Sequence, residues 1–318
     1  MKKVLTMTMN PCIDRTIFLE NFQVGGTNIV KKVMEEAAGK GINVAVGLKH
    51  IDVPVKALGF ANKEDAWKLY QKLEKEQIPY SFVEVEGRLR INQKIFDEEK
   101  SQMTECNEKG MDVSETDLEK LLHLLEKELQ EASILVVSGS VPPGVKTDIY
   151  AVMTAMAKKA GVKTILDASG KLLVEGIREK PYLIKPNKEE FIRTFLSEQV
   201  GTEAQIEEMA EELIRKGLSY ICLSAGEEGV VFFSSAKEAD AKVLIEKRPA
   251  FAVPIRSLQG AGDAMVAGLC KAVYEKQEDK MLDYALQMAA STIMLEGTQM
   301  GNLPAYSMYS KNAAVNIL

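Results

Sequence analysis

The stretch SETDLEKLLHLLEKELQEASILVV (residues 114–137) decides the fold, because it sets an amphipathic helix directly before a buried strand. Ser114-Glu115-Thr116-Asp117 has the pattern of a capped helix start, and leucines follow at helical spacing, at Leu118, Leu121, Leu122, Leu125 and Leu129. Ile134-Leu135-Val136-Val137 is a continuous apolar run, which is typical of a strand covered on both faces. This pattern predicts a helix that packs on a parallel sheet.

The same alternation of helix and strand continues toward the C-terminus. The sequence predicts further helices over 147–160, 204–217, 263–276 and 280–296, and strands over 163–167 and 219–224. Repeated strand–helix units favour a mainly parallel sheet with helices on both faces. We therefore expect residues 1–318 to form a single large α/β unit.

The first third of the chain has a different pattern. A strand over 3–9 and helices over about 39–49 and 63–76 fit the α/β unit, but short β-prone pieces lie between them. These pieces include 15–19, 27–30, 80–85 and 91–96. We expect segments of about 13–37 and 80–106 to form a small inserted β-sheet, a candidate lid over the active site.

Composition excludes several classes of protein. The chain has 46% hydrophobic and 27% charged residues and a formal net charge of -6, which argues against a nucleic-acid-binding surface. Its four cysteines have no C-x-x-C spacing, so neither a disulfide framework nor a zinc site is indicated, and its two histidines make histidine chemistry improbable. We find no secretion signal and no run of 18 apolar residues, so we expect a cytoplasmic protein without membrane contact.

Polar or glycine-rich turns follow five predicted strands, at residues 10–14, 138–144, 185–190, 224–229 and 260–263. The carboxyl ends of parallel strands meet at one edge of a sheet, where ligands of such folds bind. This shared location predicts an active site there.

Gly260-Ala261-Gly262-Asp263 is the most informative of these turns, because it delivers a carboxylate to the first turn of a predicted helix. Glycines let backbone N–H groups approach an anion, and the helix start adds its positive dipole end. Asp263 could then accept the proton of an attacking hydroxyl during phosphoryl transfer. The alternative is a carboxylate that only stabilises the helix start.

Gly39-Lys40-Gly41 has a glycine-flanked lysine at the start of a helix. It is not a P-loop, since Met34 and Gly41 replace the required glycine and hydroxyl residue, and Val44 replaces the third glycine of a dinucleotide fingerprint. The segment, with Asn43 one turn on, suits a cradle for a phosphate or sugar hydroxyls, or is a simple loop-to-helix junction.

Other polar residues have two readings each. Asp14 follows the first strand and could bind sugar hydroxyls or form a turn, and Arg90 could clamp a phosphate or lie exposed on an edge strand. Asn187 and Glu190 could contact Mg²⁺ through water or cap a helix. Residues 224–229 form either a hairpin turn or a nucleotide-phosphate loop.

Six ordered segments together give the chain a family resemblance over nearly its whole length. It resembles the ribokinase-like (PfkB) carbohydrate kinases, in their 1-phosphofructokinase and tagatose-6-phosphate kinase branch. This resemblance implies a three-layer α/β sandwich with a mainly parallel central sheet and a small β-sheet lid. The segments are Thr8-Met9-Asn10-Pro11-Cys12-Ile13-Asp14, Gly39-Lys40-Gly41-Ile42-Asn43-Val44-Ala45, Leu89-Arg90-Ile91-Asn92, Ser138-Gly139-Ser140-Val141-Pro142-Pro143-Gly144, Lys185-Pro186-Asn187-Lys188-Glu189-Glu190 and Gly260-Ala261-Gly262-Asp263.

The resemblance also implies a role for each matching residue. Asp263 would be the general base beside an anion hole, and Asn187 and Glu190 would organise Mg²⁺ and the phosphates. The anion hole would consist of Gly260, Ala261 and Gly262, the last of which also meets the nucleotide; the substrate would contact Asp14, Gly39, Lys40, Asn43 and Arg90; the ATP loop would contain Ser224, Gly226 and Gly229. Lid strands of relatives often pair between subunits, which implies a homodimer.

Several positions depart from the usual family pattern. Ala38 replaces the first glycine of Gly-Gly-Lys-Gly, residues 61–65 replace a glycine-rich turn, Leu258-Gln259 precede the anion hole where a small hydroxyl residue and Val are usual, and Ala264 stands where Ser is frequent. Asp263 and its glycines are retained, so we expect activity.

The expected reaction is ATP- and Mg²⁺-dependent phosphorylation of a ketohexose phosphate. Fructose 1-phosphate, giving fructose 1,6-bisphosphate, is the favoured acceptor, and tagatose 6-phosphate is second; dependence on K⁺ stays open. A non-catalytic sugar-phosphate sensor is the alternative from another class, and an NAD-dependent reductase is disfavoured because no complete dinucleotide fingerprint follows a strand.

Overall fold

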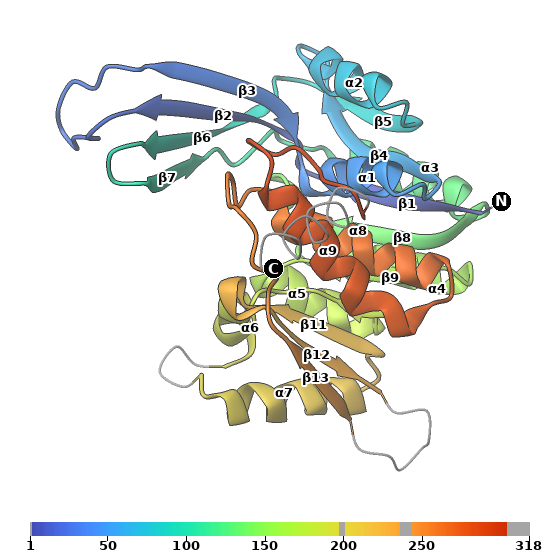
Figure 1. Cartoon of the computed structure of the whole chain (residues 1–318). Helices are drawn as coiled ribbons and strands as arrows, with labels where there is room; N and C mark the ends of the chain where they lie inside the picture. The colour runs from blue at the N-terminus through green and yellow to red at the C-terminus, as the bar shows by residue number, and fades with distance from the viewer. Residues whose placement is uncertain (1, 197–200, 236–242, 304–318) are drawn as a thin grey trace.

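A nine-stranded sheet forms the centre of the computed structural model, which describes residues 2–196, 201–235 and 243–303. The order is β13-β12-β11-β10-β9-β8-β1-β4-β5, and neighbours from β11 to β5 are parallel (Figure 1). The strands are β1 (Lys3–Thr8), β4 (Val55–Asn62), β5 (Tyr80–Val85), β8 (Ala132–Ser138), β9 (Lys163–Asp167), β10 (Leu183–Ile184), β11 (Tyr220–Ser224), β12 (Val230–Ser234) and β13 (Leu244–Arg248).

Helices cover both faces of this sheet, which makes the fold a three-layer α/β sandwich. One helical layer consists of α1 (Lys40–His50), α8 (Ala261–Tyr274) and α9 (Met281–Ile293), which contact one another. The other is a continuous series of contacting helices: α3 (Glu115–Leu129), α4 (Ile149–Lys159), α5 (Gly170–Gly176), α6 (Lys188–Phe195) and α7 (Glu203–Arg215). A further helix, α2 (Ala66–Lys75), contacts β4. The expected fold class is confirmed.

The central strands are apolar on both faces, as the sequence predicts. Leu5 of β1, Val136 of β8 and Ile165 of β9 have no exposed surface, so both helical layers bury apolar side chains against the sheet. Gly41 permits an especially close approach, because a Cβ atom at this position would lie 2.5 Å from the carbonyl oxygen of Met7. The first turn of α1 therefore sits directly on the end of β1.

A second sheet of four strands projects from the α/β body (Figure 1), and we call it the lid sheet. Its order is β3-β2-β6-β7, with β2 (Cys12–Leu19), β3 (Lys32–Ala38), β6 (Arg90–Asp97) and β7 (Gln102–Asn107). The chain thus leaves the body twice to build it. Asp14, Glu36 and Asn92 stand at the same level on three neighbouring strands.

Two expectations about the second sheet are wrong. The piece over 80–85 is β5, which pairs with β4 at the edge of the large sheet, so the second lid segment begins at Arg90. The piece over 27–30 is not a strand, and β3 begins at Lys32. An edge strand with one covered face alternates between apolar and polar residues whichever sheet it joins, so the pattern did not identify its partner.

Residues 260–263 do not directly follow a strand, contrary to the sequence prediction. The preceding strand β13 ends at Arg248, and residues 249–259 run without helix or strand to the start of α8. Thus four, not five, of the predicted turns directly follow a strand. None of the helices in the described ranges is both long and apolar enough to span a membrane.

Candidate active site

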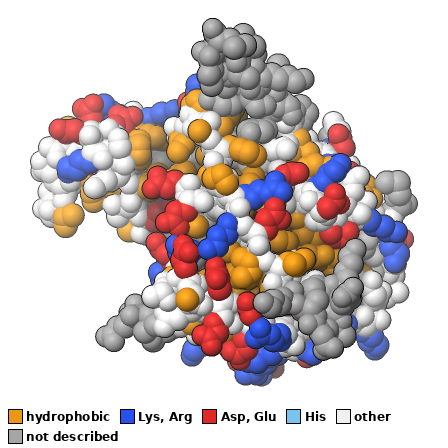
Figure 2. Space-filling view, turned by 60° about the horizontal axis from the view of Figure 1, so that its bottom comes forward, with side chains coloured by type: hydrophobic (Ala, Val, Ile, Leu, Met, Phe, Trp, Pro, Cys, Tyr) orange, Lys and Arg blue, Asp and Glu red, His pale blue; other side chains and the backbone are white. Residues whose placement is uncertain are grey.

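A polar cavity of about 870 Å³ lies between the lid sheet and the carboxyl ends of β1, β8 and β9. In Figure 2 the lid sheet projects at the left, with a hollow between it and the body. Eight of the residues predicted from the sequence line the cavity: Asp14, Gly39, Lys40, Asn43, Arg90, Glu190, Gly260 and Asp263. The fold therefore brings residues from both ends of the chain together.

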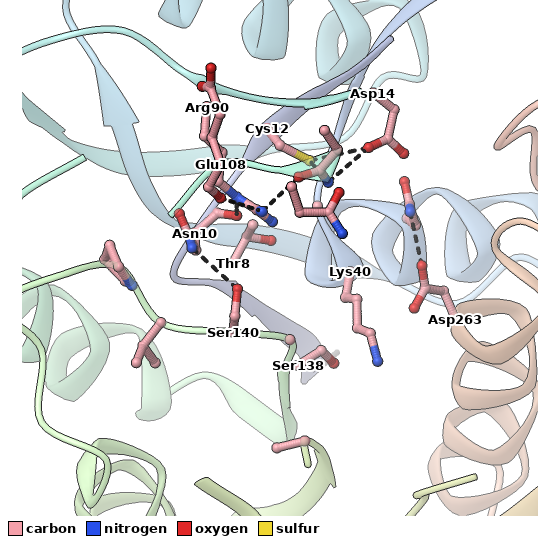
Figure 3. A pocket seen from close by; sticks show the side chains of 18 of the residues that line it. Thr8, Asn10, Cys12, Asp14, Lys40, Arg90, Glu108, Ser138, Ser140 and Asp263 are labelled. Atoms are coloured by element: carbon pink, nitrogen blue, oxygen red, sulfur yellow. Dashed lines mark hydrogen bonds between the residues drawn. The ribbon is translucent and has the colours of Figure 1, made fainter. Parts of the chain in front are cut away.

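Asp263 lies in the first turn of α8, directly beside the cavity (Figure 3). Gly260 caps this helix with φ +76°, a conformation that favours glycine. The Asp263 side chain is buried, and Asn43 Nδ2 donates a hydrogen bond of 2.9 Å to its Oδ2. Burial raises the pKa of Asp263 to about 6, against the opposing charge of Lys40. A carboxylate with this pKa can accept a proton near neutral pH.

Lys40 lies between Asp263 and a second buried carboxylate, that of Asp167 at the end of β9. Lys40 Nζ donates to Asp167 Oδ2 at 3.1 Å, and Lys185 Nζ lies 3.5 Å from the other oxygen. Burial acts to raise the pKa of Asp167, but Lys185 and Lys40 more than offset it, so the pKa is held below its usual range. Two cations, of which Lys40 lines the cavity, thus flank one ionised carboxylate beneath its lining.

Asp14 is held on the lid side of the cavity by two donors. Lys94 Nζ lies 2.9 Å from Asp14 Oδ2, and Asn92 Nδ2 donates to Asp14 Oδ1 at 3.0 Å. Lys94 also donates to Gln259 Oε1 at 2.9 Å. Both carboxylate oxygens of Asp14 are therefore held in place by hydrogen bonds.

Arg90 forms part of the cavity wall where β6 begins. Its Nη1 donates to Asn92 Oδ1 at 2.7 Å and to the Glu108 carbonyl oxygen at 3.2 Å, and its Nε donates to the Asn10 carbonyl oxygen at 3.3 Å. Figure 3 shows it beside Glu108 and Asn10. These contacts hold the guanidinium at the cavity wall, as a phosphate clamp requires.

Several buried polar atoms of the cavity lining have no hydrogen-bond partner in the described structure. They are Thr8 Oγ1, Asn10 Oδ1, Asn43 Oδ1 and Ser138 Oγ. Buried polar groups normally find partners, and leaving one unpaired costs about 1–3 kcal/mol. A ligand rich in hydroxyl or phosphate groups would supply them.

The remaining predicted residues lie beside the cavity and not in its lining: Ala261, Gly262, Asn187, Ser224, Gly226 and Gly229. Gly262 is nevertheless close to Lys185, whose Nζ would be 3.4 Å from a Cβ atom added at the glycine. Gly262 and Lys185 thus link the start of α8 to the end of β10.

Two alternative readings from the sequence are confirmed as structural facts. Asn187 caps α6, since its Oδ1 accepts from Glu190 N and Glu190 Oε2 accepts from Asn187 N. Residues 224–229 turn β11 into the antiparallel β12, and Ser224 pairs with Asn187 through an isolated bridge. The caps and the hairpin place these residues on the same edge as the cavity.

Sequence reasoning missed three charged residues of the site, namely Asp167, Lys185 and Lys94. Asp167 ends a predicted strand, so the rule that selected the other turns would have found it. Lys185 lay inside a motif from which only Asn187 and Glu190 were selected. For Lys94 the sequence held no signal, because its partners Asp14 and Gln259 are distant along the chain.

Comparison with known protein families identifies the family to which this chain belongs. The model of the pfkB family carbohydrate kinases matches residues 7–305, and the chain belongs to this family. The chain is accordingly an ATP-dependent phosphosugar kinase.

The relatives give a more particular result. The chain is 30% identical over 318 residues to the 1-phosphofructokinase of Vibrio cholerae, covering 100% of this chain and 98% of the relative. It is similar in structure to a possible 1-phosphofructokinase from Thermotoga maritima (TM-score 0.80, 29% identity, 97% of each chain covered). The fold also matches phosphofructokinase-2 from Escherichia coli in complex with substrates and products (TM-score 0.86, 24% identity, 97% of this chain and 99% of that one).

Proposed function

We propose that this chain is a 1-phosphofructokinase, which transfers the γ-phosphoryl group of ATP to the free primary hydroxyl of fructose 1-phosphate. One observation carries the proposal: the buried Asp263 carboxylate stands at the start of α8 and faces a polar cavity that also holds Lys40 and Arg90. The name of the full-length relatives supports fructose 1-phosphate over tagatose 6-phosphate as the acceptor.

Asp263 acts as the general base in this proposal. The acceptor oxygen forms a bond to the γ-phosphorus while the bond from that phosphorus to the bridging oxygen of ADP breaks. The proton of the hydroxyl passes to Asp263, whose pKa of about 6 leaves it mostly ionised before the reaction. Backbone N–H groups of Gly260, Ala261 and Gly262 at the helix start face the charge that develops on the phosphoryl oxygens.

The acceptor is held by residues of the lid sheet and of the first turn of α1. Arg90 and Lys40 bind its phosphate, because both cations line the cavity. Asp14, Asn43 and the backbone at Gly39, which all line the cavity, bind its hydroxyls. Closure of the lid sheet over the sugar keeps water away from the phosphoryl group.

The nucleotide lies along the edge formed by the ends of β10 and β11, with Ser224, Gly226 and Gly229 against it. The nearby donor set also fits Mg²⁺. Glu190 lines the cavity, and its bond with Asn187 N uses only one of its carboxylate oxygens. Within the described ranges, no group of three or more His, Cys, Asp and Glu side chains could hold a metal ion. Nucleotide phosphates and water would thus supply the other ligands of an ion that neutralises phosphate charge.

The lid sheet is the proposed contact between two copies of the chain. It exposes apolar side chains, among them Val24, Val33 and Met103 (91%, 43% and 41% exposed), and Figure 2 shows hydrophobic side chains at its tip. We place the reaction in the cytoplasm, where cells hold ATP and phosphorylated hexoses. Light scattering during size-exclusion chromatography measures the oligomeric state, and a monomer at assay concentration would contradict the dimer.

The function is tested by measuring ADP release with ATP and Mg²⁺, comparing kcat/KM for fructose 1-phosphate and tagatose 6-phosphate. A clear preference for fructose 1-phosphate supports the proposal, whereas a preference for tagatose 6-phosphate reassigns the acceptor. Sugar binding without turnover would identify a sensor, and exchange of K⁺ for Na⁺ in the same assay measures any dependence on K⁺.

A further inference from the structure

Lys94 connects the lid sheet to the loop that begins the helix of Asp263. It lies in the middle of β6, and its side chain is only 8% exposed. Its Nζ is 2.9 Å from Asp14 Oδ2 and 2.9 Å from Gln259 Oε1. One ammonium group therefore holds a residue of the lid sheet and a residue of the body at the same time.

The contact with Asp14 orients the carboxylate from the lid side. Asn92 and Lys94 stand on the same face of β6, two residues apart, and each donates to a different oxygen of Asp14. Cys12 Sγ also donates to Asp14 Oδ1 at 3.5 Å, and Asp14 lines the cavity. Lys94 also balances the negative charge of this nearly buried carboxylate, which would otherwise be costly to keep ionised.

The contact with Gln259 reaches the phosphoryl-transfer side. Gln259 immediately precedes Gly260, the N-cap of α8, and its own backbone N–H donates to Ser257 Oγ at 3.2 Å. Asp263 follows four residues after Gln259 in the first turn of that helix. A shift of Gln259 would therefore move the backbone that presents the N–H groups of the helix start.

We propose that Lys94 is a positioning residue that couples the acceptor site to the start of α8. It fixes Asp14 for the sugar hydroxyls and, through Gln259, holds the lid sheet at the spacing that the helix start requires. This inference rests on the proposed kinase function, because it assigns the coupling to the acceptor and donor halves of the same cavity. Stability alone does not account for the pair, since a buried ion pair can often be replaced by apolar residues without loss.

Three variants test the coupling. Lys94→Met removes the ammonium and both of its contacts at similar side-chain length. We expect the KM for the phosphosugar to rise about 10–100-fold, the range expected on losing a charged hydrogen bond, and kcat to fall at least as far as in Gln259→Leu, while the KM for ATP changes less than about twofold. Lys94→Arg keeps a charged donor and should recover at least part of that loss. Gln259→Leu leaves the Lys94–Asp14 pair intact, and we expect kcat to fall by about 10–100-fold, because the lost hydrogen bond has a charged ammonium donor.

The double variant Lys94→Met/Gln259→Leu measures the coupling itself. If the two residues act together, the loss of kcat/KM for the phosphosugar in the double variant is no larger than in Lys94→Met alone. Lys100→Met is the matched control, because Lys100 lies in the turn after β6 and does not line the cavity. Thermal unfolding of each variant shows whether it is folded, and binding of the phosphosugar by calorimetry provides a readout that does not need turnover.

Three results would overturn the coupling: a Lys94→Met enzyme within twofold of wild type, equal losses in Lys94→Met and Lys100→Met, or fully additive losses in the double variant. Should Lys94→Met fail to fold, Lys94→Arg and Gln259→Leu decide in its place, and wild-type constants in both would overturn the proposal. The ratios of KM and kcat between each variant and the wild type are measured with whichever of fructose 1-phosphate and tagatose 6-phosphate the wild type accepts. Wild-type turnover judges the acceptor separately, so failure of the coupling and failure of the proposed function give different results.

Discussion

Asn43 Nδ2 donates a hydrogen bond of 2.9 Å to Asp263 Oδ2, and these two residues are 220 positions apart in the chain. The bond spans the contact between α1 and α8. The close approach of Gly41 to the end of β1 sets how far α1 lies from the sheet in that contact. An amide that donates to a carboxylate favours its ionised form, so Asn43 partly counteracts the burial of Asp263. Asn43 therefore both orients the carboxylate of Asp263, the proposed base, and favours its ionised form.

The pH dependence of the reaction should report Asp263. With a pKa of about 6, the carboxylate is protonated and inactive as a base in acid. We expect kcat/KM for the phosphosugar to fall tenfold per pH unit below about 6, once the titration of the substrate phosphate is accounted for. Activity that stays constant down to pH 5 would exclude Asp263 as the base.

The Asp263→Asn variant should separate catalysis from binding. The amide can still meet Asn43 but cannot accept the proton, so we expect kcat to fall by about 10²–10⁴. The dissociation constant of ATP, measured by calorimetry, should change little. Near-normal turnover would contradict the assignment.

The same substitution should stabilise the protein at neutral pH. Because the pKa of Asp263 is about 6 in the folded state and 3.8 in an unperturbed aspartate, the folded state retains a proton that the unfolded state has released between about pH 4 and 6. Stability from this group is thus lost as pH rises through that window. We expect Asp263→Asn to gain about 1–3 kcal/mol near pH 8 and much less near pH 4, measured by urea unfolding. An equal gain at both pH values would show that the buried charge is not the cause.

Arg90→Ala should mainly weaken binding of the phosphorylated acceptor. We expect its KM to rise about 10–100-fold, because a charged hydrogen-bond donor is lost from the cavity wall. Arg88→Ala is the control, since Arg88 is exposed, pairs with Glu108 at 3.2 Å and does not line the cavity. If Arg90→Ala weakened unphosphorylated fructose equally, the phosphate clamp would be wrong.

Gly41→Ala should be strongly destabilising for a steric reason. The new Cβ atom would stand 2.5 Å from the Met7 carbonyl oxygen, so α1 must move off β1. We expect a loss of about 2–4 kcal/mol in urea unfolding, together with loss of activity as Lys40 and Asn43 shift. Gly161→Ala, which has φ +70° but meets no atom within 4 Å, should cost only about 1–2 kcal/mol. Similar costs for both would mean that α1 adjusts freely.

The sequence could predict which residues gather at the strand ends, because local chemistry signals both the strand and the polar turn that follows it. Asp14 was found in this way, whereas Lys40 and Asp263 were found from glycine-rich turns that begin a helix, and all three line one cavity. Tertiary partners could not be predicted. The bond from Asn43 to Asp263 depends on how α1 packs on α8, and the position of Lys94 between Asp14 and Gln259 depends on how the lid sheet sits on the body.

The error over 80–85 has a similar origin. Alternation of apolar and polar residues shows that one face of β5 is covered but does not show which strand it pairs with, and its true neighbour is β4. In contrast, the apolar run Ile134-Leu135-Val136-Val137 of β8 is typical of a strand covered on both faces, so its place could be predicted.

The lid sheet is built from two segments of the chain, Cys12–Ala38 and Arg90–Asn107. Each segment starts and ends on neighbouring strands, so it leaves and re-enters the body at nearly the same place. These segments supply one wall of the cavity, while residues of α6, of α8 and of the segment that follows β9 supply the other. The two walls can consequently accumulate substitutions under separate selection. A chain organised in this way can change its sugar substrate during evolution without changing its phosphoryl donor site. Gln259 lies at the boundary between the two walls, so a change of sugar specificity would have to remain compatible with its contact to Lys94.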